Sequence, residues 1–240
     1  MRGRWLRQPA EEIVREYERW FGLMGAANVE MHEMYEVEFP AFYDFPLPGL
    51  SMEILTFSDT VAMLFDTQGR TDANVTSRLG NTLARLFAAG ADCGFLFRGA
   101  VGFGDFYRGM QSRVLVGPAV DEAAEWYDKA EWAGIHLTPS TTRRPNPRNP
   151  RNEPSIAEAP LFVTYNVPLK QGGCVSATAL DWTAFSRDRL ARQVEEQFLQ
   201  SPVSVDGERK RQNTLAFRAA MERRRAEDDT DAQEPFSTQG

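Results

Sequence analysis

One apolar run, from Met52 to Phe65, constrains the fold of this chain more than any other segment. Its residues, MEILTFSDTVAMLF, are apolar or β-branched almost without a break. This pattern predicts a central strand that is buried on both faces. Asp59 stands in the middle of the run, where a charged side chain is unexpected because burying an unpaired carboxylate costs free energy. The segment therefore predicts both the centre of a sheet and a candidate functional residue.

Helix and strand patterns follow one another along the rest of the chain. A helix is expected over residues 71–92, because Val75, Leu79, Leu83, Leu86 and Phe87 share one helical face and Gly90 stands near the end. Two β-hairpins are expected: one over 93–120 with Gly104 and Asp105 at or near its bend, and one over 161–182 with Gly172 and Gly173 in its turn. Between them, a helix is expected over 121–132 and a strand over 135–140. Two further helices are expected over roughly 183–200 and 207–225.

This order of elements predicts an α/β sandwich of the α+β kind, with a mixed, largely antiparallel sheet flanked by helices. Residues 1–50 are expected to form an N-terminal helix, over 9–34, and an aromatic, proline-rich loop. Residues 51–225 are expected to form one catalytic-size domain with a mobile loop near 141–155. Residues 226–240 are acidic and polar, which predicts a disordered tail.

Composition excludes several classes of protein. The 240 residues carry a net charge of −7, which argues against a surface that coats nucleic acid or a polybasic membrane patch. The two cysteines, Cys93 and Cys174, lie far apart, so a disulfide framework and a Cys-rich zinc site are not expected. No segment approaches the ~20 apolar residues of a membrane-spanning helix, and no apolar run follows the basic start. We expect a soluble cytoplasmic protein that binds neither nucleic acid nor membrane.

Two carboxylates stand where apolar residues are expected: Asp59 in ILTFSDTVAMLF and Asp105 in AVGFGDFY. A strand and a neighbouring hairpin that bring them together would form a divalent-cation site, and oxygen ligands favour Mg²⁺ or Mn²⁺. Zinc is not favoured, because the histidines, His32 and His136, give no ligand spacing. The alternative is that Asp59 caps a turn and that Asp105 is an ordinary hairpin-turn residue.

Three segments together resemble a known enzyme family, the class III nucleotidyl cyclases. FSDTVAMLF is similar to the first-strand signature in which an aspartate binds metal, and RGAVGFGDFY is similar to the Gly-Asp element of the family's hairpin. VGPAVDEAAEWYDKAEWAGIHLTPS resembles the later segment that runs through a helix into a strand. The resemblance covers roughly residues 52–140. The length, the early FSDT and the RGAV element are most like the pyrimidine cyclases of bacterial Pycsar anti-phage systems.

The resemblance implies a reaction and its participants. Asp59 and Asp105 would bind two Mn²⁺ or Mg²⁺ ions, with the carbonyl of Thr60 as a further ligand. The activity would be a uridylate cyclase, a phosphorus–oxygen lyase that converts UTP to 3′,5′-cyclic UMP and pyrophosphate, or a cytidylate cyclase that converts CTP to cyclic CMP. A homodimer is implied, because the family builds composite sites at a dimer interface. The product would be a second messenger for a separate effector in antiviral defence.

The chain departs from the family on the helix after the hairpin. Purine cyclases have an Asn and, four residues later, an Arg, whereas this chain has Asp121 and Glu125. Arg98, Arg113 and Lys170 are the candidates for the missing cation. Lys170 matches the position of the family's phosphate-binding lysine, although an ordinary surface lysine is the alternative.

Selection of a pyrimidine base requires a narrowed pocket and a polar group at the base edge. Tyr43 and Arg98 are the candidates for these roles. Alternatively, Tyr43 is a core residue and Arg98 pairs with Glu53 or Asp92. Two further functions stay open: a catalytically inactive cyclase-like module that binds a nucleotide or a partner, and a purine nucleotide cyclase.

Overall fold

The computed structural model describes residues 11–12, 15–16, 18–20, 51–57, 60–66, 73–109, 114–142, 161–184, 187–199 and 204–231. Its main sheet has four strands in the order β3-β6-β8-β7. Strand β3 pairs with β6 in parallel, whereas the pairs β6–β8 and β7–β8 are antiparallel. This arrangement confirms the mixed, largely antiparallel sheet of an α+β fold. The strands span Arg98–Val101 (β3), Gly134–Leu137 (β6), Phe162–Pro168 (β7) and Cys174–Leu180 (β8).

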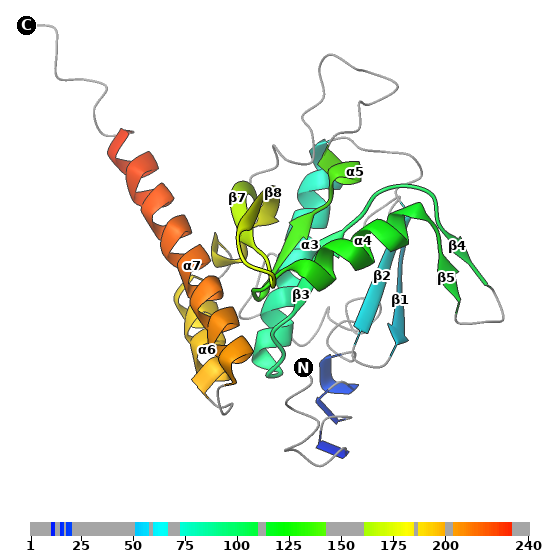
Figure 1. Ribbon diagram of the computed structural model, residues 1–240, viewed down its shortest axis with the longest axis horizontal. Helices are drawn as coiled ribbons and strands as arrows, with labels where there is room; N and C mark the ends of the chain where they lie inside the picture. The colour runs from blue at the N-terminus through cyan, green and yellow to red at the C-terminus, as the bar shows by residue number, and fades with distance from the viewer. Residues whose placement is uncertain are drawn as a thin grey trace, which may run out of the picture.

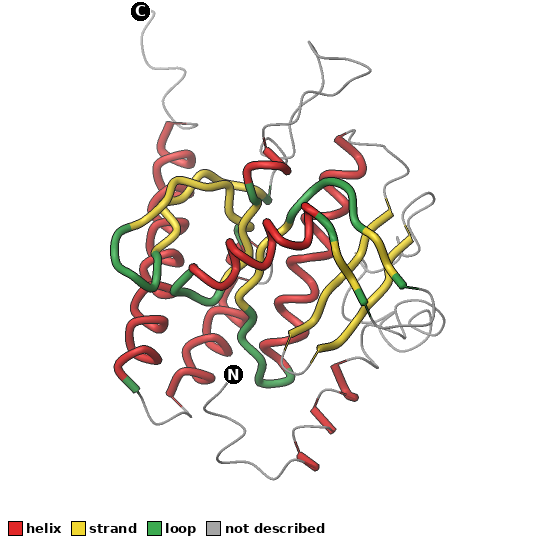
Figure 2. The backbone as a smooth tube through the Cα atoms, turned by 45° about the vertical axis from the view of Figure 1, so that its right-hand side comes forward, coloured by secondary structure: helices red, strands yellow, loops and turns green. Residues whose placement is uncertain are grey.

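Helices cover the sheet, as Figures 1 and 2 show. Side chains on β6 alternate between its faces, so that Ile135 and Leu137 join the core that includes α3, whereas the His136 ring lies 5.8 Å from the Trp126 ring of α4. The two helices therefore lie on opposite faces of β6. The helices span Ala73–Asp92 (α3), Pro118–Lys129 (α4), Pro139–Thr142 (α5), Trp182–Ala184 (η3, a 3₁₀ turn), Arg187–Leu199 (α6) and Val205–Asp231 (α7).

A cluster of aromatic rings joins the sheet to α7. The Phe217 ring of α7 lies edge-on to Trp132 at 4.9 Å and to Tyr165 of β7 at 4.8 Å. Trp132 and Phe217 are completely buried, so they fix the position of α7 against the sheet. Its complete burial makes Trp132 a packing residue of the core.

The expected single strand over residues 52–65 is wrong. Two antiparallel strands, β1 (Ser51–Phe57) and β2 (Thr60–Asp66), occupy the segment and form a separate two-stranded sheet. Phe57 pairs with Thr60, so only Ser58 and Asp59, which lie outside the described residues, separate the strands in the sequence. Serine and aspartate are turn-forming residue types, and a two-residue connection is typical of a tight hairpin. The central position in the main sheet belongs to β6, whose four residues are all buried.

The expected hairpin over residues 93–120, with its bend at Gly104 and Asp105, is also wrong. β3 pairs with β6, and the antiparallel ribbon is shorter: β4 (Tyr107–Arg108) pairs with β5 (Leu115–Val116). The Gly109 amide donates to the Val114 carbonyl at 3.0 Å and continues this pairing beyond Arg108 and Leu115, away from Gly104 and Asp105. Local alternation does not distinguish a hairpin partner from a strand more than thirty residues away, which explains the error.

Other expected elements agree with the structure. The expected face of α3 is buried at Leu79, Leu83 and Phe87 and half-buried at Leu86. Gly90 near its end is required by packing, because a Cβ atom there would lie 2.0 Å from the Phe97 ring. The β7–β8 hairpin turns at Gly172 and Gly173, whose φ angles of 89° and 74° suit glycine.

The expected boundaries of the domain shift in two places. Thr141 and Thr142 belong to α5, and Thr141 is buried, so the expected mobile loop does not begin at residue 141. Helix α7 continues to Asp231, past the expected start of the tail at residue 226. Arg225 anchors this end of the helix by donating to Asp181 at 2.9 Å. The rest of the loop, to 155, and of the tail, to 240, lies outside the described residues.

The N-terminal helix is partly described. Residues 11–12, 15–16 and 18–20 are helical, as expected, and Trp20 is fully buried. Its ring lies 4.7 Å from Phe97, and Val61 and Met63 of β2 pack on the same cluster. The expected aromatic loop over 37–50 lies outside the described residues. Among the described helices, none combines the length and apolar character that crossing a membrane requires.

Candidate functional site

The candidate metal ligand Asp105 lies between β3 and β4, beside the first turn of α4. Its side chain is exposed. The Asp105 carbonyl accepts a long hydrogen bond, 3.5 Å, from the amide of Ala119 in α4. Within the described residues its carboxylate accepts no hydrogen bond and forms no ion pair. An uncommitted carboxylate is a suitable ligand for Mg²⁺ or Mn²⁺.

Close backbone contacts hold Asp105 against α4, and glycines make them possible. Gly117, the N-cap residue of α4, has a φ of 146°, and a Cβ atom there would lie 2.6 Å from the Asp105 carbonyl oxygen. A Cβ atom at Gly102 would lie 2.5 Å from the Ala119 carbonyl oxygen. Gly104, between Gly102 and Asp105, has a φ of 150°, a backbone conformation that favours glycine. The Gly-Phe-Gly-Asp sequence therefore packs closely on the start of the helix.

Three of the predicted site residues, Tyr43, Asp59 and Arg113, lie outside the described residues. Thr60, whose carbonyl is the further candidate ligand, begins β2 and is half-buried. Asp59 directly precedes it in the sequence.

The two described candidate cations, Arg98 and Lys170, meet on one carboxylate. Lys170 Nζ lies 2.6 Å from Asp128 Oδ1, and Arg98 Nη2 lies 3.9 Å from the same oxygen. Arg98 also donates to the Ala130 carbonyl at 2.9 Å and lies 5.8 Å from the centre of the Tyr127 ring. Asp128 is therefore the ionic partner of Arg98, whereas the alternative considered from the sequence was Glu53 or Asp92. Asp128 could not be predicted from the sequence, because no local pattern shows which carboxylate the β7–β8 turn approaches.

A third cation, Lys210 of α7, lies close enough to interact with both. Burial lowers the pKa of Lys210, and the positive charges of Arg98 and Lys170 lower it further. Lys210 was not among the sequence candidates, because it lies in a helix that follows the whole sheet.

Asp105 and this cationic group lie at opposite ends of α4, as Figure 1 shows for β4–β5 and the β7–β8 turn. Asp105 contacts Gly117 and Ala119 at the start of the helix, whereas Arg98 and Lys170 contact residues at its end. The 12 residues of α4 span about 18 Å. The structure therefore brings Arg98 and Lys170 together, but within one chain it does not bring either to Asp105.

The two acidic residues that depart from the cyclase pattern lie on exposed turns of α4. Asp121 is exposed in the first turn, and Glu125 forms an ion pair with Lys129 one turn later. Neither side chain can donate a hydrogen bond when ionised. Asp121 and Glu125 therefore lack the hydrogen-bond donors that an Asn and an Arg would offer at these two positions.

His136 is buried under α4, with 1% of its surface exposed, and its Nδ1 has no hydrogen-bond partner. Burial, and to a smaller extent the charge of Arg98, lower the pKa of His136 to about 4. The ring is therefore neutral at pH 7. The ring packs between Trp126 and Trp132, so we interpret His136 as a core residue.

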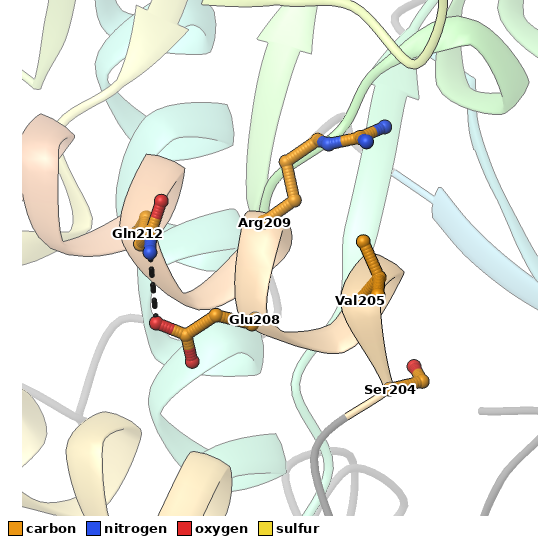
Figure 3. Close-up of a pocket in the computed structure, with 5 residues that line it drawn as sticks. All are labelled: Ser204, Val205, Glu208, Arg209 and Gln212. Atoms are coloured by element: carbon orange, nitrogen blue, oxygen red, sulfur yellow. Dashed lines mark hydrogen bonds between the residues drawn. The ribbon is translucent and has the colours of Figure 1, made fainter.

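A pocket of about 540 Å³ opens at the start of α7, lined by Ser204, Val205, Glu208, Arg209 and Gln212. Figure 3 shows Gln212 directed at Glu208 and Arg209 directed away from both. Hydrogen bonds from Arg211 and then Gln212 lower the pKa of Glu208 to about 2. Its carboxylate is therefore fully committed and is a poor proton acceptor.

Metal-ligating side chains do not form a group of three among the described residues. Asp105 and the Thr60 carbonyl each offer an oxygen donor of the kind that Mg²⁺ and Mn²⁺ prefer.

The chain matches no protein-family model, no curated protein and no solved structure.

Proposed function

We propose that this protein is a metal-dependent pyrimidine nucleotide cyclase that converts UTP to 3′,5′-cyclic UMP and pyrophosphate, with CTP as the other candidate substrate. The observation that carries the proposal is the exposed, uncommitted carboxylate of Asp105, held on a Gly-Phe-Gly-Asp segment against α4. The FSDT sequence at the β1–β2 connection supplies the second carboxylate, Asp59.

Each residue has a distinct role in this proposal. Asp59, Asp105 and the Thr60 carbonyl would hold two Mn²⁺ or Mg²⁺ ions. When bound, such ions polarise the α-phosphate and lower the pKa of the ribose 3′-hydroxyl. The 3′-oxygen then forms a bond to the α-phosphorus, the bond to the pyrophosphate oxygen breaks, and the hydroxyl proton passes to solvent. The base would be selected by Tyr43 and Arg98, and the phosphates would be held by Lys170 and Arg113.

Separation along α4 supports a composite site. Arg98 and Lys170 lie about 18 Å from the end of α4 that contacts Asp105, too far to contact the same phosphoryl group. A homodimer would place these cations from one copy beside Asp105 of the other. Mixing the inactive variants Asp105→Ala and Lys170→Ala should then restore partial activity, because each mixed dimer keeps one complete site. Failure of every mixture, with mixed dimers present, would contradict the composite site.

The test of the reaction is incubation of the purified protein with each of the four nucleoside triphosphates and Mn²⁺, followed by mass identification of the products. We expect a cyclic pyrimidine monophosphate that is lost in Asp59→Ala and Asp105→Ala and kept in Asp206→Ala, an exposed aspartate on α7. Activity that survives in both carboxylate variants would overturn the metal assignment. Competition among the four triphosphates separates a pyrimidine from a purine cyclase.

The second candidate function is a cyclase-like module that binds a nucleotide or a partner without turnover. Asp121 and Glu125 favour it, because they cannot donate to the transferring phosphate. Tight nucleotide binding without product at any Mn²⁺ concentration would identify this function. If turnover occurs, the cyclic product would act in the cytoplasm as a second messenger for a separate effector.

A further inference from the structure

The carboxylate of Glu122 connects α4 to the turn that follows β6. Glu122 Oε2 accepts a hydrogen bond from the Thr138 hydroxyl at 2.9 Å, and Oε1 accepts one from the Ser140 amide at 3.1 Å. Thr138 is completely buried, and its hydroxyl oxygen also lies 3.0 Å from Ser140 Oγ. Glu122 therefore binds the backbone of Ser140 directly and its hydroxyl through Thr138.

The same turn holds the chain that leads to Asp105. Ser140 Oγ accepts a hydrogen bond of 3.0 Å from the amide of Phe103, which is two residues before Asp105. Two residues earlier in the chain, the Val101 carbonyl accepts from the Thr138 amide at 3.0 Å and from the Thr141 hydroxyl at 2.7 Å. Residues 101–103 are thus attached to residues 138–141 by three hydrogen bonds.

Asp105 is held from the other side by α4, through the Ala119 amide and the close approach of Gly117. No described side chain bonds to its carboxylate, so the direction of that carboxylate depends on its backbone. The backbone in turn depends on Ser140 on one side and α4 on the other. Glu122 belongs to α4 and binds Ser140, so it connects the two supports.

We propose that Ser140 and Glu122 are positioning residues, which set the carboxylate of Asp105 in the geometry for divalent-cation binding. This inference rests on the proposed function and deepens it by naming the support of the metal ligand. Residues that orient a ligand without touching the metal commonly affect metal affinity by about 10- to 100-fold. The sequence offered no signal for either residue, because neither lies in a metal-binding motif.

The test is Mn²⁺ binding to the full chain, measured by electron paramagnetic resonance, for Ser140→Ala and Glu122→Gln. Ser140→Ala removes the acceptor of the Phe103 amide, and Glu122→Gln replaces one accepting oxygen with a donor. Both should raise the Kd for Mn²⁺ about tenfold or more, whereas Ser140→Thr, which keeps the hydroxyl, should restore most of the affinity. Thr142→Ala is the matched control, because in the part of the chain that the structure describes the Thr142 hydroxyl bonds only to carbonyls of its own turn.

Activity and stability are measured in parallel. If the two residues act on metal binding, excess Mn²⁺ restores kcat in Ser140→Ala while the KM for UTP stays unchanged, and thermal unfolding without metal shifts no more than in Thr142→Ala. Wild-type Mn²⁺ affinity in both variants, with loss of binding in Asp105→Ala, would overturn the inference and leave the proposed function intact. Equal Mn²⁺ binding by wild type and Asp105→Ala would overturn both.

Discussion

Lys170 Nζ lies 2.6 Å from Oδ1 of Asp128, so the residue that best matches a phosphate-binding lysine is neutralised by a carboxylate of its own chain. A phosphate group must compete with Asp128 for Lys170 and for Arg98 beside it. We predict that Asp128→Asn lowers the KM for UTP, or the Kd of a non-hydrolysable analogue, about tenfold. Because this pair is largely exposed, the melting temperature should hardly change.

The control for this prediction is the double variant Asp128→Asn with Lys170→Gln, in which the freed cation is removed again. Its affinity should return to the wild-type value or below. Unchanged affinity in Asp128→Asn would exclude Lys170 and Arg98 from the phosphate site.

His136 makes stability depend on pH in the acid range. Its pKa in the folded protein is lowered to about 4 by burial and by Arg98, against 6.5 in the unfolded chain. Between these values the unfolded chain binds a proton that the folded protein does not, so stability is full above pH 6.5 and falls as the pH drops towards 4. The contribution is on the order of 3 kcal/mol.

Urea unfolding at pH 7.5 and at pH 4.5 measures this effect. His136→Leu removes the titration, so its free energy of unfolding should fall less than that of the wild type over the same range. Parallel losses in the two proteins would show that His136 does not carry the acid sensitivity.

A substitution at Gly117 tests the close packing of Asp105 on α4. Gly117→Ala places a Cβ atom 2.6 Å from the Asp105 carbonyl oxygen at a φ of 146°, so both the contact and the conformation are unfavourable. We expect a loss of stability of about 2–3 kcal/mol together with loss of Mn²⁺ binding. Gly172→Ala also has a positive φ, but its Cβ atom meets open space, so it should cost only about 1 kcal/mol. Equal stability losses in the two variants would contradict the close approach.

A substitution at Arg225 tests how the last part of α7 is attached to Asp181 and Thr183. It donates to Asp181 at 2.9 Å and to the Thr183 hydroxyl at 2.9 Å, and Asp181 is 7% exposed. Arg225→Ala leaves a buried carboxylate without its cation, which should lower the free energy of unfolding by about 2 kcal/mol. Arg224→Ala, an exposed change on the same helix, should lower it by less than about 0.5 kcal/mol. Chemical denaturation of both variants measures the difference, and equal values would argue against the buried pair.

Elements whose signals are local could be predicted from the amino-acid sequence. The apolar face of α3 repeats at helical spacing, and Gly172 and Gly173 mark a two-strand turn. These features depend on residues a few positions apart, so they can be predicted without knowing the fold. Asp105 was predicted as a candidate ligand in the same way, from a polar residue in an apolar context.

Tertiary structure alone decided which distant segments meet. β3 pairs with β6, more than thirty residues later, and Met52 to Phe65 divides into two paired strands. The sequence likewise did not predict that Arg98 and Lys170 both approach Asp128. Nor did it predict that the Phe103 amide and the Glu122 carboxylate both bond to Ser140. Such contacts depend on how whole helices and strands pack, and a hydrogen bond between segments leaves no periodic pattern in either one. The candidate ligand was therefore visible in the sequence, whereas its supports and its distance from the cations were decided by packing around α4.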